Sequence, residues 1–405
     1  MSAAPGAVRR AADKPVTVLQ VLPQLLPGGI ERDALDVAGA VAAAGGVSLV
    51  ATSGGALINE VYRVGAQPVF LPLDQTGTIA RYQNAGRIGR ALQKHGVDLV
   101  HMHSRLSGWS VVAAAQRAGL PLVTSVYNHY AGEPQSGRRP TAAVAEGDRI
   151  LAVSDFAAEQ LAGLHAEAAP RLRIVDRGID LVRFDPERVT GERMVQLARD
   201  WRLVDGRPLV LVPARFLRCK GHAIVIEAVA ALAGRDLHCL LLGFDVDGPG
   251  YRAELEQAIA RRGLGERIRI VPGCADLPAA YMLADVVVSA STSPEAYART
   301  IVEAQAMGRP VVATRHGDAA QQAGHGKMAW LVPPGDAGAL AGALSRALAL
   351  SAAERRTYAP HAIALARARL SQHVLRRQTL QVYDELLRAG PAARRRDDPA
   401  LAPSP

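Results

Sequence analysis

The 405-residue sequence has few cysteines, few aromatic side chains and no long apolar run. Its three cysteines, Cys219, Cys239 and Cys274, have neither paired nor metal-binding spacing, which predicts a reducing compartment and no disulfide framework. No stretch of about eighteen uninterrupted apolar residues is present, so we expect no transmembrane helix. Arg9 and Arg10 near the N-terminus are not followed by the apolar run of a signal peptide. We therefore expect a cytoplasmic protein.

Aromatic residues make up 4% of the chain and hydrophobic residues 49%, so Ala, Val and Leu must supply most of the core. This composition favours an α/β protein over an all-β protein, and the length predicts two domains. The formal net charge is +9. The basic residues are not interleaved with aromatic ones as in proteins that bind single-stranded nucleic acid. An anionic substrate or membrane surface is therefore the expected partner, and nucleic acid is not.

Short apolar runs alternate with longer amphipathic runs. The short runs have apolar side chains at both odd and even positions, as parallel strands covered on both faces do. The expected strands are Val16–Leu22, Val47–Thr52, Pro68–Leu71, Leu99–Met102, Leu122–Val126, Arg149–Val153 and Arg173–Val175, then Leu209–Pro213, His238–Leu242, Ile268–Val271, Val286–Ser289, Val311–Thr314 and Trp330–Val332. The helical patterns between them include Ile30–Ala44, Asn84–His95, Ala223–Ala233, Tyr251–Arg261 and Ala337–Leu350.

Seven strands followed by six are too many for one ordinary sheet. The chain is therefore predicted to form two doubly wound, Rossmann-like α/β domains facing across a cleft. The predicted limits are 14–190 for the first domain and 191–370 for the second, followed by a helical segment at 371–390. Residues 391–405 are rich in Ala, Pro and Arg and are expected to be disordered.

Two glutamates, Glu295 and Glu303, lie eight residues apart directly after the expected strand Val286–Ser289. A helix is predicted to begin near Ala296, and eight helical residues rise about 12 Å, roughly the reach of a nucleotide-sugar from sugar to ribose. The helix N-terminus between the carboxylates suits a pyrophosphate. Glu303 would then accept from ribose hydroxyls, and Glu295 would face the sugar. The alternative is an acidic helix start with one solvated Glu.

Two cations, Arg215 and Lys220, follow the first strand of the second domain, at the edge where open α/β sheets bind ligands. With Gly221 allowing close backbone approach, they would clamp a diphosphate and stabilise its departure without a metal. The alternative is a pair of ordinary surface charges. Because the glutamate pair is expected on the same edge, the diphosphate clamp is favoured.

The first domain has further candidates. Gly28 and Gly29 occupy the first strand-to-helix turn, where backbone N–H groups approach a phosphate, although the G-x-G-x-x-G string of a dinucleotide site is absent. His101 and His103 end the fourth strand on one face, but without a third ligand we expect no metal. His103 or Arg105 is expected to contact an acceptor, with strand-end packing as the alternative.

Taken in order, these motifs resemble those of the family 4 glycosyltransferases, which are retaining enzymes of the two-domain GT-B fold. The resemblance covers most of the chain and is nearest to bacterial transferases that build lipopolysaccharide or other surface glycans. Its motifs are Pro27-Gly28-Gly29-Ile-Glu-Arg, His101-Met-His103-Ser-Arg, Val153-Ser154-Asp155, Arg177-Gly178-Ile-Asp180-Leu-Val-Arg-Phe184, Arg215-x4-Lys220-Gly221, Glu295-x7-Glu303 and Gly308-Arg-Pro-Val-Val-Ala-Thr.

The resemblance implies a role for each motif. Arg215 and Lys220 would bind the donor diphosphate and stabilise the leaving group, while Glu303 would bind the ribose. Glu295 would lie by the donor sugar. The loop of Gly28 and Gly29 would close on the donor, and the C-terminal helix would cross back to the first, acceptor-binding domain. The backbone that would hold sugar and phosphate comprises Tyr297, Ala298, Arg299, Thr300 and Ile301.

The resemblance also implies transfer from a nucleotide-sugar to a glycan or lipid-linked acceptor, with retention of configuration and without metal or another cofactor. Besides Gln321, which stands where Glu is common, three departures from the family pattern bear on activity. Tyr127 stands where a His often follows the fifth strand, and His129 lies two residues on; both are assigned to the acceptor side. Ala298 and Asp318 replace frequent glycines, and an Asp near a diphosphate would be repulsive.

Three hypotheses remain open. The leading one is a sugar transferase with a further, peripheral contact at the anionic inner face of the cytoplasmic membrane. The second is a catalytically weak homologue that binds nucleotide-sugar or glycan, which the three departures favour. The third is a sugar-nucleotide epimerase of the same fold, against which the pattern of Arg215, Lys220, Glu295 and Glu303 argues.

Overall fold

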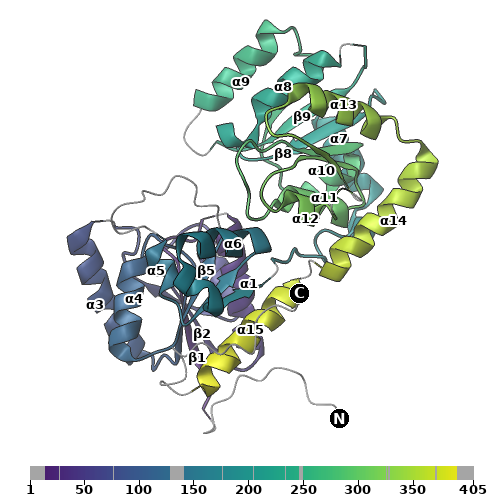
Figure 1. The fold of residues 1–405 in the computed structure, drawn as a ribbon. Helices are drawn as coiled ribbons and strands as arrows, with labels where there is room; N and C mark the ends of the chain where they lie inside the picture. Colours follow the sequence, from purple (N-terminus) through teal and green to yellow (C-terminus); the bar gives the residue numbers. More distant parts are fainter. Residues whose placement is uncertain are drawn as a thin grey trace, which may run out of the picture. The chain divides into compact units, whose positions relative to one another are not determined.

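The computed structural model describes residues 14–26, 28–75, 77–127, 141–175, 177–203, 205–232, 234–245, 250–324, 326, 329–369 and 372–389. The chain divides into two compact units, residues 1–177 with 372–405, and residues 178–371 (Figure 1). Each unit has one sheet, of seven and six strands, and every neighbouring pair of strands is parallel. The prediction of two doubly wound α/β units is confirmed.

The sheet of the first unit consists of β1 Thr17–Val21, β2 Val47–Thr52, β3 Gln67–Phe70, β4 Leu99–Met102, β5 Leu122–Val126, β6 Arg149–Ala152 and β7 Leu172–Ile174. Their order is β3-β2-β1-β4-β5-β6-β7. Strand β1 pairs with both β2 and β4, so the direction in which strands are added reverses there. Open α/β sheets bind ligands at the carboxyl ends of the strands at such a switch point.

The helices of the first unit are α1 Gly29–Ala43, α2 Ile58–Arg63, α3 Thr78–Lys94, α4 Gly108–Ala118, α5 Ala142–Ala145, α6 Asp155–Leu164, the 3₁₀ helix η1 Ala166–Arg171, and the C-terminal α15 Gln372–Arg388. Helices α1 and α15 contact each other and pack on the sheet. Val37 of α1 and Tyr383 of α15 join Leu99 of β4 in one buried apolar cluster.

The sheet of the second unit consists of β8 Leu209–Pro213, β9 His238–Gly243, β10 Ile268–Pro272, β11 Val286–Ser289, β12 Val311–Thr314 and β13 Trp330–Val332, in the order β10-β9-β8-β11-β12-β13. Its switch point lies between β8 and β11. Its helices are η2 Pro186–Arg188, α7 Gly191–Asp200, η3 Arg218–Lys220, α8 His222–Ala231, α9 Gly250–Arg261, α10 Leu277–Leu283, α11 Arg299–Ala306, α12 Ala319–Gln322, α13 Ala337–Leu348 and α14 Ala352–Arg369. Helices α8, α9 and α13 share one apolar cluster with this sheet.

Two helices begin three or more residues away from their predicted starts. Helix α11 begins at Arg299 rather than near Ala296, because Ala298 has a non-helical backbone (φ −89°, ψ 81°) and its N–H donates to the Gln322 side chain. Helix α3 begins at Thr78 rather than Asn84. Its first turn is exposed, so the apolar periodicity that marks the rest of the helix is absent there.

Residues 178–190 belong to the second unit, whereas the sequence placed the boundary after residue 190. Phe184 packs edge-on against Tyr281, with 6.0 Å between ring centroids, and Asp185 lies 3.6 Å from Arg367. These contacts join residues far apart in the sequence, so the polar local composition does not reveal them. Residues 391–405, which were expected to be disordered, lie outside the described residues.

None of the helices in the described ranges combines the length and the apolar character needed to cross a bilayer.

Candidate active site

The candidate residues of the second unit follow the two strands at its switch point. Arg215 and Lys220 come after β8, and Glu295 comes after β11. Gly221 has φ 72°, and a Cβ there would lie 1.9 Å from the carbonyl oxygen of Ala290. A glycine is therefore required for the two loops to approach each other.

Lys220 and Glu295 form an ion pair, with 2.8 Å between Nζ and Oε2. Each side chain is 21% exposed, so the pair borders solvent. The Ser291 hydroxyl donates to the other oxygen of Glu295. The structure thus brings together two residues that the sequence predicted on one sheet edge, and it fixes the Glu295 carboxylate at both oxygens.

Arg215 is exposed and has no carboxylate partner among the residues that the structure describes. Its neighbour Arg218, in contrast, pairs with Glu254 at 2.5 Å and lies over the ring of Tyr251. Arg215 is therefore the cation of this loop that remains available to an anionic ligand.

Glu303 lies inside α11 and is 5% exposed. The hydroxyl of Tyr281 donates to its Oε2 at 2.9 Å, and within the described part of the chain no other side chain or backbone group donates to it. Burial raises the pKa of the Glu303 carboxyl, while the charge of Arg299 and the hydrogen bond from Tyr281 lower it. Burial and the neighbouring carboxylate raise the pKa of Tyr281 well above its ordinary value, so Tyr281 acts as the donor. One oxygen of Glu303 is thus pinned, and Oε1 can accept from a ligand hydroxyl.

The first turn of α11 offers fewer backbone donors than the sequence suggested. The N–H of Ala298 donates to Gln322 Oε1 at 2.8 Å, and that of Ile301 to the Ala298 carbonyl at 3.0 Å. The N–H of Thr300 lies at the helix start, where no acceptor exists within the helix. Tyr297, Ala298 and Ile301 are buried, whereas Arg299 and Thr300 are half-exposed.

The carboxylate of Asp318 is buried and hydrogen-bonded within the protein. This residue is 6% exposed, and its Oδ2 accepts from Gln322 Nε2 at 2.9 Å. One oxygen of this carboxylate is therefore engaged within the protein, and the repulsion between Asp318 and a diphosphate stays a prediction.

The first unit has a buried polar network at the ends of β1, β4 and β5. His103 bonds the Tyr127 hydroxyl and Gln20 Oε1, each at 2.7 Å. His101 bonds Ser125 at 2.7 Å and the Tyr383 hydroxyl of α15 at 2.5 Å. All four ring nitrogens are engaged, so neither histidine is free to ligate a metal or contact an acceptor in this arrangement.

Burial keeps this network uncharged. It lowers the pKa of His103 to about 3 and also lowers that of His101, which lies beside it with 3.8 Å between ring centroids. Both rings are therefore neutral near pH 7. Arg105, the other acceptor-side candidate, is exposed in the loop after β4, and His129 lies outside the described residues.

An ion pair that sequence analysis did not anticipate lies beside this network. The Arg177 guanidinium bonds the buried Asp33 carboxylate of α1 and lies 5.3 Å from the centroid of the Tyr127 ring. A Cβ on Gly29 would lie 2.4 Å from Arg177 Nη2, so this guanidinium occupies the space that Gly29 leaves open. A Cβ on Gly28 would instead meet the flexible Glu31 carboxylate. In the sequence, the only indication that Arg177 has a role is its place in the motif Arg177-Gly178-Ile-Asp180.

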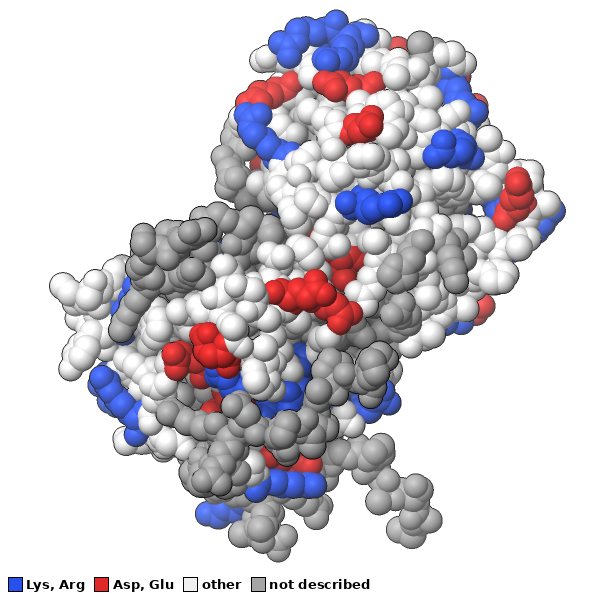
Figure 2. Space-filling model, in the orientation of Figure 1, with Lys and Arg blue, Asp and Glu red and all other residues white. Residues whose placement is uncertain are grey.

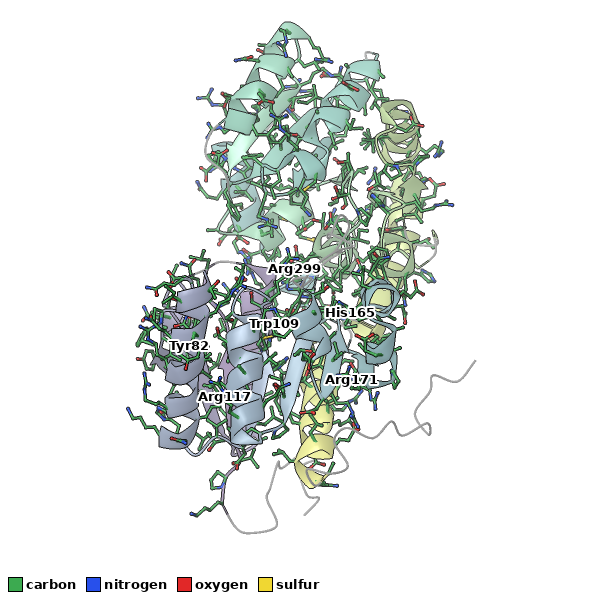
Figure 3. The ribbon with its side chains drawn as sticks, turned by 60° about the vertical axis from the view of Figure 1, so that its left-hand side comes forward. Tyr82, Trp109, Arg117, His165, Arg171 and Arg299 are labelled. Atoms are coloured by element: carbon green, nitrogen blue, oxygen red, sulfur yellow. The ribbon has the colours of Figure 1, made fainter. Side chains whose placement is uncertain are left out.

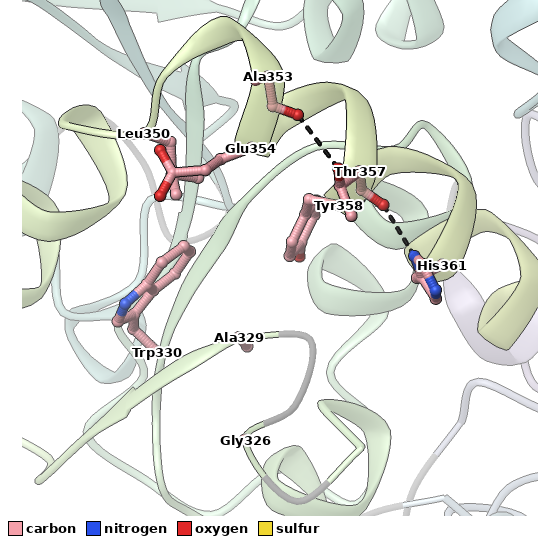
Figure 4. A pocket seen from close by; sticks show the side chains of 9 residues that line it. All are labelled: Gly326, Ala329, Trp330, Leu350, Ala353, Glu354, Thr357, Tyr358 and His361. Atoms are coloured by element: carbon pink, nitrogen blue, oxygen red, sulfur yellow. Dashed lines mark hydrogen bonds between the residues drawn. The ribbon is translucent and has the colours of Figure 1, made fainter.

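A separate cavity of about 700 Å³ lies in the second unit between β13 and α14 (Figure 4). The rings of Trp330 and Tyr358 line it at 6.5 Å between centroids. Glu354, the carboxylate at its rim, accepts from the N–H and hydroxyl of Ser351 at the start of α14. None of the predicted site residues lines this cavity.

On the face shown in Figure 2, Lys and Arg alternate with Asp and Glu and do not gather into one patch.

Two family profiles match the chain. The one described as "Glycosyltransferase Family 4" matches residues 27–183, and "Glycosyl transferases group 1" matches residues 196–362. The chain is 34% identical over 295 residues to the D-inositol 3-phosphate glycosyltransferase of Actinosynnema mirum, a match covering 67% of this chain and 68% of that enzyme. It is 32% identical to the enzyme of the same name from Catenulispora acidiphila, covering 54% and 56%. The chain thus spans about half to two thirds of these relatives.

Solved structures share the fold. A glycosyltransferase from Rickettsia africae superposes with a TM-score of 0.86 at 27% identity, covering 93% of this chain and 100% of that one. Anabaena HepE in complex with UDP-glucose has a TM-score of 0.78 at 22% identity, covering 91% and 99%. WaaG, a glycosyltransferase involved in lipopolysaccharide biosynthesis, has a TM-score of 0.71 at 17% identity, covering 92% and 100%.

Proposed function

The chain belongs to the glycosyltransferases of family 4, and from this membership we propose that it transfers a sugar from a nucleotide-sugar to a glycan or lipid-linked acceptor in the synthesis of a bacterial surface polysaccharide. The transfer retains the anomeric configuration and needs no metal. The observation that carries this proposal is the Lys220–Glu295 pair at the switch point of the second sheet, together with Arg215 of the same loop, which has no carboxylate partner among the described residues.

This arrangement suits a departing nucleoside diphosphate. Arg215 supplies an available cation, and Lys220 can exchange part of its contact with Glu295 for a phosphate oxygen. Two cations placed before the reaction stabilise the charge that develops on the leaving group. A metal ion is then unnecessary for that task.

Glu295 and Glu303 suit the two ends of the donor. Glu303 keeps Oε1 for the ribose hydroxyls, because Tyr281 occupies Oε2. Glu295 is held by Ser291 and Lys220, so its carboxylate is oriented before the sugar arrives. Such pre-orientation lowers the cost of ordering the site when the donor binds.

The names of similar proteins guide the choice of substrates. HepE is described in complex with UDP-glucose, so a uridine diphosphate sugar is the first donor to test. WaaG is described as acting in lipopolysaccharide biosynthesis, which supports a glycan acceptor. The curated relatives are named for inositol 3-phosphate, which makes a phosphorylated polyol the alternative small acceptor.

A second candidate function is binding of nucleotide-sugar with little or no transfer. Ala298 favours it, because its side chain stands where glycine is frequent in the family pattern and makes the approach of the backbone to the donor tighter. Tyr127 favours it as well, because its hydroxyl is bonded to His103 within a buried network.

Turnover by the purified protein distinguishes the candidates. UDP-, GDP- and ADP-sugars would be offered with a bacterial glycan extract or inositol 3-phosphate, with and without EDTA, and the anomer of the product identified by NMR. We expect nucleotide release that survives EDTA and falls at least about a hundredfold in Lys220→Ala and Glu295→Ala. Arg262→Ala, which removes a surface cation paired with Glu227, is the matched control and keeps full activity. Binding without release would instead support the second candidate.

A peripheral membrane contact is part of the proposal. Helix α3 has four basic residues and no acidic one. In its N-terminal half, Ile79 is 76% exposed and Tyr82 is 73% exposed. Figure 3 labels Tyr82 on this helix. A basic helix with exposed apolar side chains suits the surface of an anionic bilayer. This contact would place the first unit near a lipid-linked acceptor.

A further inference from the structure

The segment that follows β12 lies along the loop that carries Glu295. The N–H of Asp318 donates to the Glu295 carbonyl at 3.0 Å, and His316 Nε2 lies 3.2 Å from the Thr292 carbonyl oxygen. Gly317 has φ 56°, and a Cβ there would lie 2.2 Å from the Glu295 carbonyl oxygen. The two loops therefore touch through their backbones at the residue proposed to face the donor sugar.

Gln322 joins the same two loops through its side chain. Its Oε1 accepts from the Ala298 N–H at 2.8 Å, and its Nε2 donates to Asp318 at 2.9 Å. Gln305 Nε2, on α11, donates to the Gln322 carbonyl at 3.1 Å. All these groups are buried, so solvent does not compete for the three hydrogen bonds.

Asp318 and the Ala298 N–H together fix the orientation of the Gln322 amide. A carboxylate oxygen accepts hydrogen bonds, so it selects the NH₂ end of the amide and leaves the carbonyl end for the backbone N–H. A glycine at position 318 would leave the NH₂ end without this acceptor, and only the Ala298 N–H would then fix the orientation of the amide. The acidic residue and the glutamine therefore act as one unit.

We propose that Asp318 and Gln322 are positioning residues that hold the donor loop of this enzyme in place. They hold the Ala298 N–H outside the helix, so that α11 begins at Arg299 and presents the backbone that follows Ala298 to the donor. This inference rests on the proposed function of that loop. Asp318 then has a positioning role in the site, whereas its place in the sequence suggested only that it would repel a diphosphate.

The test compares Asp318→Ala, Asp318→Asn, Gln322→Leu and the double variant Asp318→Ala/Gln322→Leu. Amide hydrogen exchange is measured without ligand, and KM and kcat are measured for donor and acceptor. We expect Asp318→Ala and Gln322→Leu each to speed exchange at Ala298 and raise donor KM by about tenfold, the effect of one buried hydrogen bond, with acceptor KM unchanged. Asp318→Asn retains most of the function, because its side-chain oxygen still accepts from Gln322.

The double variant should show the same donor KM and the same exchange rate at Ala298 as Gln322→Leu alone, because Asp318 acts through Gln322. Asp336→Ala is the matched control: Asp336 caps α13 by accepting from the Ala339 N–H at 2.8 Å, so its loss lowers stability without changing donor KM. Unchanged exchange at Ala298 in Asp318→Ala, or additive effects in the double variant, would overturn the proposal. A wild type that turns over no donor refutes the transferase function, while the exchange result still decides the positioning role.

Discussion

At the scale of single residues, the charged groups of the candidate site are held by neighbours that sequence patterns did not identify. Tyr281 holds Glu303, and Ser291 holds Glu295. Phe184 packs against Tyr281 and so contacts the residue that holds Glu303. These neighbours determine where each carboxylate points.

Replacing Tyr281 with Phe tests this arrangement through pH. Burial raises the pKa of Glu303 above its usual value, and the Tyr281 hydrogen bond opposes that rise, so Tyr281→Phe raises the pKa further. A raised folded-state pKa means that stability is highest while the carboxyl is neutral and falls as pH rises through that pKa. We expect a loss of about 1–3 kcal/mol at pH 7 and a smaller loss near pH 4, measured by urea unfolding.

Tyr358→Phe is the matched control for that measurement. Tyr358 is a largely buried tyrosine of the same unit whose hydroxyl meets the backbone of Val311 instead of a carboxylate. Its loss should destabilise the protein equally at both pH values. An equal loss at both pH values in Tyr281→Phe would show that the hydrogen bond does not favour the charged form of Glu303.

At the scale of elements, the basic residues of α3 lie on two sides of the helix. Arg87, Arg90 and Lys94 lie within about 60° of one another around the helix axis, whereas Arg81 lies about 180° from Arg90. The single basic face needed for a membrane contact therefore excludes Arg81. Ile79 is within about 20° of Arg90 around the axis, which places an exposed apolar side chain along the same face.

Neutralising this face should weaken binding to anionic vesicles. Each cation near an anionic surface contributes about 1 kcal/mol, so the triple change Arg87→Gln, Arg90→Gln and Lys94→Gln should reduce affinity about a hundredfold in a vesicle sedimentation assay at low salt. A control that replaces three cations outside α3, namely Arg63, Arg117 and Arg388, separates this face from net charge. Equal loss in both variants would mean that net charge alone drives the binding.

At the scale of the whole molecule, all the proposed donor residues of the second sheet lie in one continuous segment. Residues 178–371 contain Arg215, Lys220, Glu295 and Glu303 together with an apolar core of their own. In the first unit, in contrast, a segment distant in the sequence completes the core, through Tyr383 and Leu386 of α15. The two units therefore differ in whether one stretch of chain suffices to fold them.

The fragment 178–371 should fold alone and bind a nucleoside diphosphate without transferring sugar. We expect cooperative unfolding by circular dichroism and an affinity within about tenfold of the full chain by calorimetry, because the groups proposed to contact the diphosphate and ribose are all present. Lys220→Ala in the fragment should abolish the binding. A folded fragment that binds nothing would mean that the first unit supplies an essential part of the donor site.

The repeating strand–helix pattern by itself determined the thirteen strands, their parallel pairing and the division into sheets of seven and six. It did so because burial on both faces of a sheet leaves a local, periodic mark in the sequence. The pattern Glu295-x7-Glu303 and the cations after β8 likewise predicted that these residues lie at one edge of the second sheet, where the proposed donor site is. Only the tertiary structure decided that Lys220 pairs with Glu295, that Tyr281 pins Glu303 and that Gln322 sets the start of α11. Those contacts join residues that are far apart in the sequence. A buried polar group bonds whichever partner the fold places next to it, so the pairing leaves no periodic pattern in the sequence.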